Sequence, residues 1–218
     1  MPARSRIMIV DDHPIFRKGL GQLINEETDM EVCGEAEDVP GAKRLLDKLK
    51  PDMVIVDLSL KGVSGLELIR YIHDQSPGRL VLVMSMHDEA VYAERALKAG
   101  ARGYIMKQEM TGKVVTALRQ VLNGRMFFSE DIVESILGRV AVDSQAVRKD
   151  PVSTLSDREL EVFTLIGRGM GRQEMASLLN VSIKTIGSYR EKIKEKLNIK
   201  SSPELAKRAV EWVQEQGG

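Results

Sequence analysis

The chain has 218 residues with 32 basic and 32 acidic side chains, so its formal net charge is zero. This length suits two modest domains, and the first 128 residues are also neutral, with 18 basic and 18 acidic side chains. The net charge therefore gives no information on whether the partner is a nucleic acid or a membrane. The single cysteine, Cys33, excludes an intramolecular disulfide bond, and the first apolar run is too short for a signal peptide or membrane span, so we expect a cytoplasmic protein with no membrane partner.

Strand-like and helical patterns alternate over the first 122 residues. The strand-like segments are apolar runs without polar alternation, typical of strands buried on both faces of a parallel sheet, at 6–10, 31–35, 52–56, 80–85 and 103–106. Segments with helical periodicity follow each of them, at 13–26, 39–49, 64–75, 88–99 and 111–122. Five such pairs predict a doubly wound α/β domain with a five-stranded parallel sheet.

Polar side chains stand where four of these strands end. Asp11 and Asp12 follow the first strand, and Asp57 follows the third. Ser85 ends the fourth, and Lys107 follows the fifth. Ligands of parallel α/β sheets bind beyond the carboxyl ends of the strands. If these strands lie side by side, three carboxylates, one hydroxyl and one ammonium group share a crevice.

The carboxylates of this crevice predict a metal ion. Three carboxylates close together repel one another. We therefore expect either a bound divalent cation or a raised pKa of at least one of the carboxyl groups. A donor set of oxygens alone, with no His or Cys nearby, favours Mg²⁺ over zinc. A carboxylate nucleophile beside Mg²⁺, an ammonium and a hydroxyl suits the acceptance of a phosphoryl group, because the cations neutralise charge on the phosphoryl oxygens.

The remainder of the chain has helical patterns only. An amphipathic stretch at 130–139 is followed by a polar segment ending in Pro151, which is typical of a linker. We therefore expect a first domain at 1–128, a helix and linker at 129–153, and a second domain at 154–218.

The second domain has the spacing of a helix-turn-helix. Ser156 and Glu159 form a capping-box pattern at the start of its first helix. A short helix at 173–179, a three-residue turn and a longer helix at 183–197 follow, and Ser202 is expected to be the N-cap of a final helix.

Together these motifs resemble a known family. Residues 6–125 resemble a two-component receiver domain and residues 154–216 resemble a LuxR-type helix-turn-helix, so the whole chain resembles a NarL/FixJ family response regulator. The resemblance implies a flavodoxin-like receiver with strand order 2-1-3-4-5 and an all-α, four-helix DNA-binding domain. It also implies a cognate histidine kinase, double-stranded DNA and a homodimeric phosphorylated form as partners.

The resemblance assigns a role to each residue of the crevice. Asp57 would accept the phosphoryl group, and Mg²⁺ would be held by Asp11, Asp12, Asp57 and the backbone carbonyl of Ser59. Ser85 and Lys107 would contact the phosphoryl oxygens, while Tyr104 matches an aromatic residue that moves inward when the Ser85 hydroxyl engages phosphate.

Three positions near the crevice qualify the match. Many receivers have proline where this chain has Lys61, so their loop geometry does not carry over to this position. Many also have proline where this chain has Gln108, so we expect no cis peptide after Lys107. His87 stands where family members tune the loss of the phosphoryl group, but it also fits a solvated loop histidine, and the sequence leaves both interpretations open.

The helix at 183–197 is the candidate DNA-reading helix. Ile183 to Lys200 contains six basic and two acidic residues, and Ile186, Ile193 and Leu197 fall on one face with Tyr189 beside them. Residues in the first turns read bases, so we expect base contacts from Lys184, Ser188 and Glu191, and phosphate contacts from Thr185, Arg190, Lys192 and Lys194. Gly187 and Tyr189 depart from residues common in relatives, so no DNA sequence preference carries over.

Two other functions fit parts of the sequence. One is a receiver that works without phosphorylation, as a protein-interaction module acting on the DNA-binding domain; such a module has no need for the lysine and hydroxyl. The other is an aspartate-nucleophile phosphatase, for which the chain shows no separate substrate-binding cap. We therefore expect a transcription factor and not an enzyme.

Overall fold

The computed structural model describes residues 4–60, 63–134 and 151–216. The chain divides into two compact units, Met1–Gly138 and Arg139–Gly218. The division falls inside the segment 129–153 that was predicted as helix and linker. Residues 135–150 lie outside the described part, so the limits of that linker remain a prediction. No helix within the described ranges combines the length and the apolar character needed to cross a bilayer.

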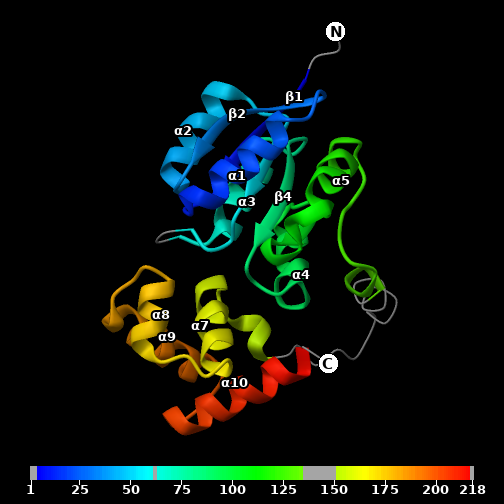
Figure 1. Cartoon of the computed structure of the whole chain (residues 1–218). Helices are drawn as coiled ribbons and strands as arrows, with labels where there is room; N and C mark the ends of the chain where they lie inside the picture. Colours follow the sequence, from blue (N-terminus) through cyan, green and yellow to red (C-terminus); the bar gives the residue numbers. More distant parts are fainter. Residues whose placement is uncertain (1–3, 61–62, 135–150, 217–218) are drawn as a thin grey trace. The chain divides into compact units, whose positions relative to one another are not determined.

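The first unit is built on a five-stranded parallel sheet (Figure 1). The strands are β1 (Ser5–Val10), β2 (Met30–Ala36), β3 (Met53–Val56), β4 (Leu80–Ser85) and β5 (Gly103–Met106). Their order is β2-β1-β3-β4-β5, and every neighbouring pair is parallel. The predicted fold class is confirmed. This order matters for function because β1, β3, β4 and β5, the four strands with polar ends, are consecutive neighbours.

Helices cover both faces of the sheet. They are α1 (Pro14–Asn25), α2 (Val39–Leu49), α3 (Gly65–Gln75), α4 (Glu89–Ala99) and α5 (Met110–Leu122). Alternate strand residues such as Ile7, Ile9 and Ile55 pack with Leu20 of α1 and Leu118 of α5 in one core. The intervening strand residues are equally buried, because side chains alternate between the faces of a strand. Burial on both faces explains the unbroken apolar runs of the sequence.

The chain returns to the sheet after α5. The backbone N–H of Tyr104 donates to the carbonyl of Phe127, and the N–H of Phe127 donates to the carbonyl of Arg102. Gly103 and Phe127 form a parallel bridge. The segment at 125–128 therefore attaches to the outer side of β5 before residues 130–134 form the start of the predicted helix at 130–139. The rest of that helix lies outside the described residues.

The second unit is all helical. A short 3-10 turn (Pro151–Thr154) precedes α7 (Asp157–Gly167), α8 (Arg172–Leu178), α9 (Ile183–Lys196) and α10 (Ser202–Gln216). The predicted capping box is present: the Glu159 N–H donates to the Ser156 hydroxyl, and the Ser156 N–H donates to the Glu159 carboxylate at 2.7 Å. The core holds Phe163 of α7 and Trp212 of α10, whose ring centroids are 5.7 Å apart.

One detail of this unit corrects the sequence prediction. Ser202 lies inside α10, and Ser201 is the residue whose hydroxyl accepts the N–H of Glu204. Gly167 is the last residue of α7 and packs against α10, because a Cβ atom there would collide with the backbone carbonyl of Ala209. α7 ends at this residue, and its small size allows the two helices to pack closely.

Candidate functional site

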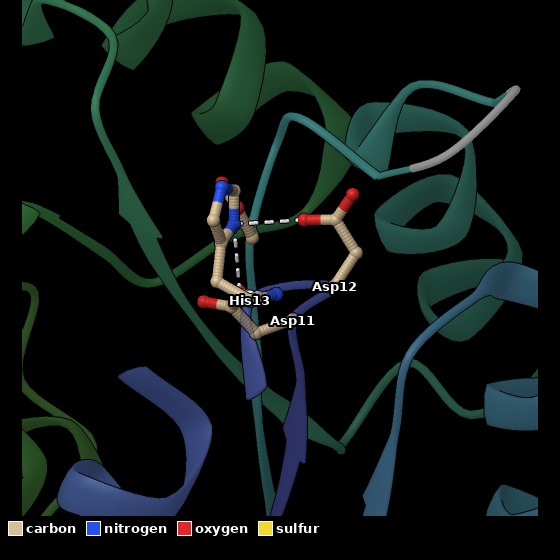
Figure 2. Close-up of side chains that lie close together, drawn as sticks. Asp11, Asp12 and His13 are labelled. Atoms are coloured by element: carbon tan, nitrogen blue, oxygen red, sulfur yellow. Dashed lines mark hydrogen bonds and ion pairs between the residues drawn. The ribbon is translucent and has the colours of Figure 1, made fainter. Parts of the chain in front are cut away.

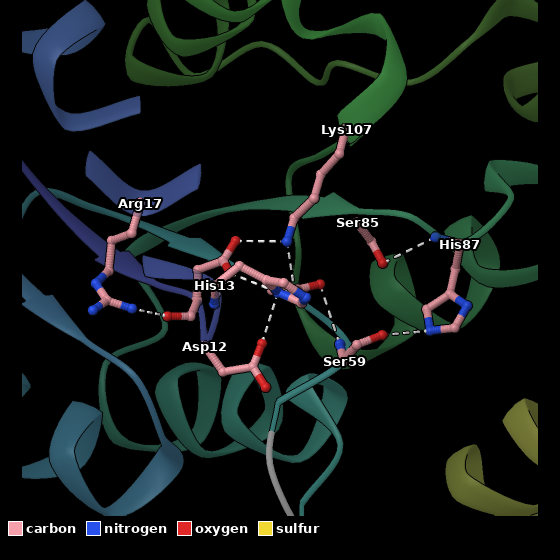
Figure 3. Close-up of polar contacts among 9 residues, drawn as sticks. Asp12, His13, Arg17, Ser59, Ser85, His87 and Lys107 are labelled. Carbon is pink, nitrogen blue, oxygen red and sulfur yellow. Dashed lines mark hydrogen bonds and ion pairs between the residues drawn. The ribbon is translucent and has the colours of Figure 1, made fainter. Parts of the chain in front are cut away.

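The strand order brings the predicted crevice residues together. Asp11 directly follows β1, Asp57 directly follows β3, Ser85 ends β4 and Lys107 directly follows β5. All four are buried, although each carries a polar or charged group. Figure 3 shows Ser85 and Lys107 converging with Asp12 on one region above the carboxyl edge of the sheet. Buried polar side chains are costly unless they are paired, so this clustering requires specific partners.

Lys107 is the partner of two carboxylates. Its Nζ lies 2.6 Å from Oδ2 of Asp11 and 2.7 Å from Oδ2 of Asp57. The same ammonium lies 4.4 Å from the ring centroid of Phe16 on α1, within the range of a cation–π contact. Lys107 thus places one compact positive charge between the two buried carboxylates, within reach of any anion attached to Asp57.

Burial affects the ionisation of Asp57. Removal from water raises the pKa of the Asp57 carboxyl above its usual range, and the nearby Asp11 carboxylate adds to this effect, while Lys107 opposes it. The backbone N–H of Ser59 also donates to Asp57 Oδ1 at 3.1 Å, which favours the charged form. The carboxylate of Asp57 therefore depends on positive charge in the crevice.

Asp12 has an oxygen that lacks a hydrogen-bond donor. Its Oδ1 is buried and accepts no hydrogen bond, although the His13 Nδ1 lies 2.8 Å away without hydrogen-bond geometry. A buried carboxylate oxygen in this position is suited to a cation. Ligand atoms of Asp11, Asp12, His13 and Asp57 all lie within 4.8 Å of one another. The residues fit a divalent cation, and the three carboxylates are the donors that Mg²⁺ prefers.

His13 was missed in the sequence analysis, which described the crevice as free of histidine. That premise is wrong. The imidazole Nδ1 lies 3.3 Å from Asp11 Oδ1 and 2.8 Å from Asp12 Oδ1, and Figure 2 shows the ring turned toward these carboxylates. His13 directly follows Asp12 in the chain, so its place at the strand end could have been found by the same reasoning that found the two aspartates.

A second polar cluster adjoins the crevice beyond the end of β4. His87 is buried, and its Nε2 lies 2.8 Å from the Ser59 hydroxyl. The His87 backbone N–H donates to the Ser85 hydroxyl, and its carbonyl accepts the hydroxyl of Tyr104 at 2.9 Å. The interpretation of His87 as a solvated loop histidine is therefore wrong. Its backbone instead links the Ser85 and Tyr104 side chains.

Tyr104 points inward. It is fully buried, and desolvation raises the pKa of its phenol well above the usual value, so the group is a neutral hydroxyl. The Tyr104 hydroxyl donates to the His87 carbonyl. The movement of this side chain on engagement of phosphate by Ser85 stays a prediction.

Arg17 also belongs to the crevice and was not predicted. Its guanidinium donates to the backbone carbonyl of Asp11 and pairs through Nε with Glu35 at 3.0 Å. Arg17 lies on α1 and Glu35 on β2, so the pair ties the loop after β1 to two neighbouring elements. A sequence offers no local signal for a contact between residues 18 positions apart.

In the second unit, α9 has the two faces that were predicted. Ile186 and Ile193 are completely buried, and Lys184, Ser188 and Lys192 are exposed. Ser182 caps the helix, accepting the N–H of Thr185 at 3.0 Å, and its hydroxyl lies 2.8 Å from that of Thr185. The first turn of α9 is therefore well ordered by its own cap, with Lys184 and Ser188 on the outside.

Not all the basic residues of α9 are available to a partner. Lys196 Nζ lies 2.6 Å from the carboxylate of Glu159 in the capping box of α7. Lys194 pairs with Glu191 at 2.8 Å, but Glu191 is exposed, so the pair is weak and a phosphate can replace it. The excess of positive charge on α9 is therefore reduced by Lys196 alone, and Lys184, Arg190 and Lys192 carry most of it.

Arg172 adds a positive charge that was not predicted. It begins α8, and it lowers the pKa of Arg190 on α9, although burial of Arg190 is the larger cause. Two guanidinium groups that repel each other are stabilised by an anion between or beside them. The signal that could have found Arg172 is its place at the start of the short helix of the helix-turn-helix.

Both units match known protein families. The family model of the response regulator receiver domain matches residues 7–119, and that of bacterial regulatory proteins of the luxR family matches residues 153–209. The chain is 35% identical over 210 residues to the oxygen regulatory protein NreC of Staphylococcus epidermidis, covering 94% of this chain and 96% of NreC.

Solved structures give the same assignment. RcsB from Salmonella enterica serovar Typhimurium, bound to the promoter rprA in the presence of the phosphomimetic BeF3⁻, is 27% identical, with a TM-score of 0.60 and coverage of 94% of this chain and 98% of RcsB. A LuxR family response regulator from Aurantimonas sp. is 37% identical, with a TM-score of 0.58 and coverage of 64% of this chain and 99% of that one. The chain therefore belongs to the NarL/LuxR family of two-component response regulators, as a receiver domain joined to a DNA-binding helix-turn-helix domain.

Proposed function

We propose that a histidine kinase phosphorylates Asp57 and that this phosphorylation controls dimerisation and transcription. The observation that carries the proposal is the position of Lys107, whose ammonium lies within 2.7 Å of both Asp11 and Asp57. A lysine and three carboxylates at a buried strand edge suit the acceptance of a phosphoryl group better than a purely structural role, because each buried charge would otherwise cost stability.

The chain's own residues divide the work of the transfer. An oxygen of Asp57 forms the bond to phosphorus as the P–N bond of the kinase phosphohistidine breaks, and the released imidazole takes up a proton. The carboxylates of Asp11, Asp12 and Asp57 and the Ser59 backbone carbonyl would hold Mg²⁺. When bound, Mg²⁺ supplies positive charge that stabilises the phosphoryl oxygens. Lys107 supplies a second positive charge.

Ser85 and Tyr104 would transmit the modification. The Ser85 hydroxyl accepts the His87 N–H and can donate its own proton to a phosphoryl oxygen on Asp57. The His87 backbone also holds the Tyr104 hydroxyl. Engagement of Ser85 by phosphate would therefore act on the same loop that fixes Tyr104. To alter occupancy strongly, the phosphoryl group has to separate the two receiver states by a few kcal/mol.

His87 and Ser59 would control how long the phosphoryl group lasts. Their side chains meet at 2.8 Å beside Asp57, where they limit the approach of water. If the His87→Ala change leaves the dephosphorylation rate unaltered, this role is excluded.

DNA binding is assigned to the outer face of α9. Lys184, Ser188 and Glu191 are the proposed base contacts. Phosphate contacts are assigned to Thr185, Arg190, Lys192 and Lys194, and we add Arg172 of α8 to them. Solved structures of RcsB include an RcsB–DNA complex and two RcsB dimers bound to DNA, and this supports double-stranded DNA and a homodimer as partners. We therefore propose that the protein acts as a cytoplasmic transcription factor and does not turn over a substrate as an enzyme.

The test compares the wild type with Asp57→Asn and with Asp74→Asn, an exposed aspartate on the same domain. Each is incubated with Mg²⁺ and acetyl phosphate, and then its mass, sedimentation and affinity for fragments of its genomic neighbourhood are measured. We expect phosphorylation, dimerisation and tighter DNA binding in the wild type and Asp74→Asn only.

The alternative of a phosphorylation-independent receiver makes the opposite prediction. It gives equal DNA binding by all three proteins, with or without the phosphoryl donor. That result would leave the DNA-binding assignment intact and exclude Asp57 as the switch.

A further inference from the structure

We infer that His13 contributes an imidazole nitrogen to the cation site of the receiver, so that the site favours first-row transition-metal ions over Mg²⁺. The inference deepens the proposed function, because it rests on the metal site formed by Asp11, Asp12 and Asp57. It concerns a residue to which neither the family match nor the sequence analysis gave a role.

The distances around His13 are those of ligands that share one ion. Its Nδ1 lies 2.8 Å from Asp12 Oδ1, 3.3 Å from Asp11 Oδ1 and 3.9 Å from Asp57 Oδ2. Donors about 2.1 Å from a common ion lie about 3 Å apart when adjacent and about 4.2 Å apart when opposite. The imidazole is mostly exposed, so small rotations of its side chain are open to it.

The local backbone directs the imidazole to the crevice. His13 occupies the N-cap position of α1, and Pro14 starts the helix. The side chain of His13 makes no capping hydrogen bond to α1, although an N-cap side chain often does. Instead the His13 backbone N–H donates to Asp11 Oδ1 at 2.8 Å, and the ring lies over the two aspartates (Figure 2).

His13 and Lys107 face different oxygens of Asp11. Lys107 contacts Oδ2 of Asp11, whereas His13 faces Oδ1 of the same carboxylate. At Asp57 the two share Oδ2, with Lys107 Nζ at 2.7 Å and His13 Nδ1 at 3.9 Å. Asp12 Oδ1, which is buried and accepts no hydrogen bond, lies on the His13 side. An ion bound between Asp12 and His13 would therefore give the Asp12 oxygen a positively charged partner, which Lys107 does not provide.

The donor type decides the selectivity. Mg²⁺ takes oxygen ligands and keeps much of its water, whereas imidazole suits ions such as Co²⁺ and Ni²⁺. For the same site, affinity rises from Mn²⁺ through Co²⁺ to Ni²⁺. Replacement of the His13 imidazole by an amide should therefore lower the affinity for Co²⁺ strongly and the affinity for Mg²⁺ only weakly.

The experiment uses the full chain and measures dissociation constants for Mg²⁺ and Co²⁺ by calorimetry. The wild type is compared with His13→Asn and with His73→Asn, which removes an exposed histidine elsewhere on the receiver. We expect His13→Asn to weaken Co²⁺ binding about tenfold and Mg²⁺ binding by less than twofold. We expect His73→Asn to change neither. Equal Co²⁺ affinity in the wild type and His13→Asn would overturn the inference.

A spectroscopic measurement gives an independent answer. In pulsed electron paramagnetic resonance of the Mn²⁺-loaded protein, a coordinated imidazole adds ¹⁴N modulation to the signal. We expect this modulation in the wild type and in His73→Asn, and its loss in His13→Asn. Its absence from the wild type would show that His13 forms only an ion pair with Asp12.

Asp12→Asn separates this inference from the proposed function. If Mg²⁺ binding depends on Asp12 but no ¹⁴N modulation is found, the metal site stands and the role of His13 fails. If Asp12→Asn leaves Mg²⁺ binding unchanged, the proposed metal site itself fails, and the inference about His13 fails with it.

Discussion

Gly65, at the start of α3, lies directly against the backbone of Asp57. A Cβ atom at Gly65 would overlap the Asp57 carbonyl oxygen and lie 2.8 Å from the Cα of Leu58. The Gly65 N–H also donates to the Leu58 carbonyl at 2.9 Å. The residue that begins α3 therefore sets the position of the loop that carries the proposed phosphoacceptor.

This contact predicts that Gly65→Ala displaces Asp57. Overpacking of a buried position costs about 1–3 kcal/mol, and here the atoms that have to move belong to the backbone of the site. We expect a lower melting temperature of the receiver and a strongly reduced rate of phosphorylation by acetyl phosphate, measured by intact mass. Gly78→Ala is the control, because a Cβ atom there meets nothing within 4 Å. Wild-type phosphorylation of Gly65→Ala would contradict the prediction.

Gly167 and Gly187 should respond oppositely to alanine. At Gly167 a Cβ atom would collide with the backbone of Ala209, so alanine should separate α7 from α10 and destabilise the unit. At Gly187, inside α9, nothing lies within 4 Å, so alanine should stabilise the helix by about 1 kcal/mol.

Urea unfolding followed by tryptophan fluorescence measures both changes. Trp212 is the only tryptophan of the chain and packs in the core of the second unit, so its signal reports on that unit. Gly187→Ala should raise the midpoint and Gly167→Ala should lower it. An unchanged or raised midpoint of Gly167→Ala would exclude the packing role given to Gly167.

Because the Glu159 carboxylate is paired, we expect the free energy of unfolding of the second unit to fall in acid. Burial alone raises the pKa of this carboxyl, but hydrogen bonds from Lys196 and Ser156 outweigh it and lower the pKa below its ordinary value of 4.5. A lowered pKa in the folded state means that the contribution to stability is complete above about pH 4.5 and declines as the pH falls through the folded value. Glu159→Gln should lower the free energy of unfolding at pH 7 and reduce its slope below pH 4.5. The Trp212 unfolding signal at a series of pH values measures both, and an unchanged slope would refute the assignment.

Substitution of Arg172 and of Lys196 should distinguish a basic residue that contacts DNA from one that forms a structural ion pair. Arg172→Ala should weaken DNA binding about equally for all sequences and reduce the salt slope of log affinity by about 1, as loss of a phosphate contact does. Lys196→Met should leave that slope unchanged and destabilise the second unit, because Lys196 is paired with the buried Glu159 at 2.6 Å.

Titration of labelled DNA at several salt concentrations measures the slope. Lys113→Ala, on the exposed surface of α5 in the receiver, is the matched loss of a positive charge. If Lys196→Met changes the slope as much as Arg172→Ala, the assignment of Lys196 to a structural ion pair is wrong.

The sequence predicted those features that depend on local pattern. Unbroken apolar runs located the strands, the residues after them located Asp11, Asp57 and Lys107, and the Ser156 capping box located the start of α7. Each of these signals extends over only a few neighbouring residues, so it can be recognised without the fold.

Features that depend on distant contacts were not predictable in this way. Lys196 meets Glu159 across 37 residues, and Arg17 meets Glu35 across 18. Pattern alone could not show that Gly167 serves the close approach of α10 or that His87 is buried. His13 is a different case, because it adjoins Asp12 in the chain and was overlooked, although the direction of its ring required the structure.

The bridge between Gly103 and Phe127 also protects the sheet. An outer strand presents unpaired backbone groups that can recruit a strand from another molecule and start aggregation. At β5 the returning segment takes up the N–H of Tyr104 and the carbonyl of Arg102, so part of this border is closed by the chain itself. A receiver fragment truncated before Phe127 would lose that closure, and isolated receivers should therefore retain the chain through residue 128 if they are to resist self-association.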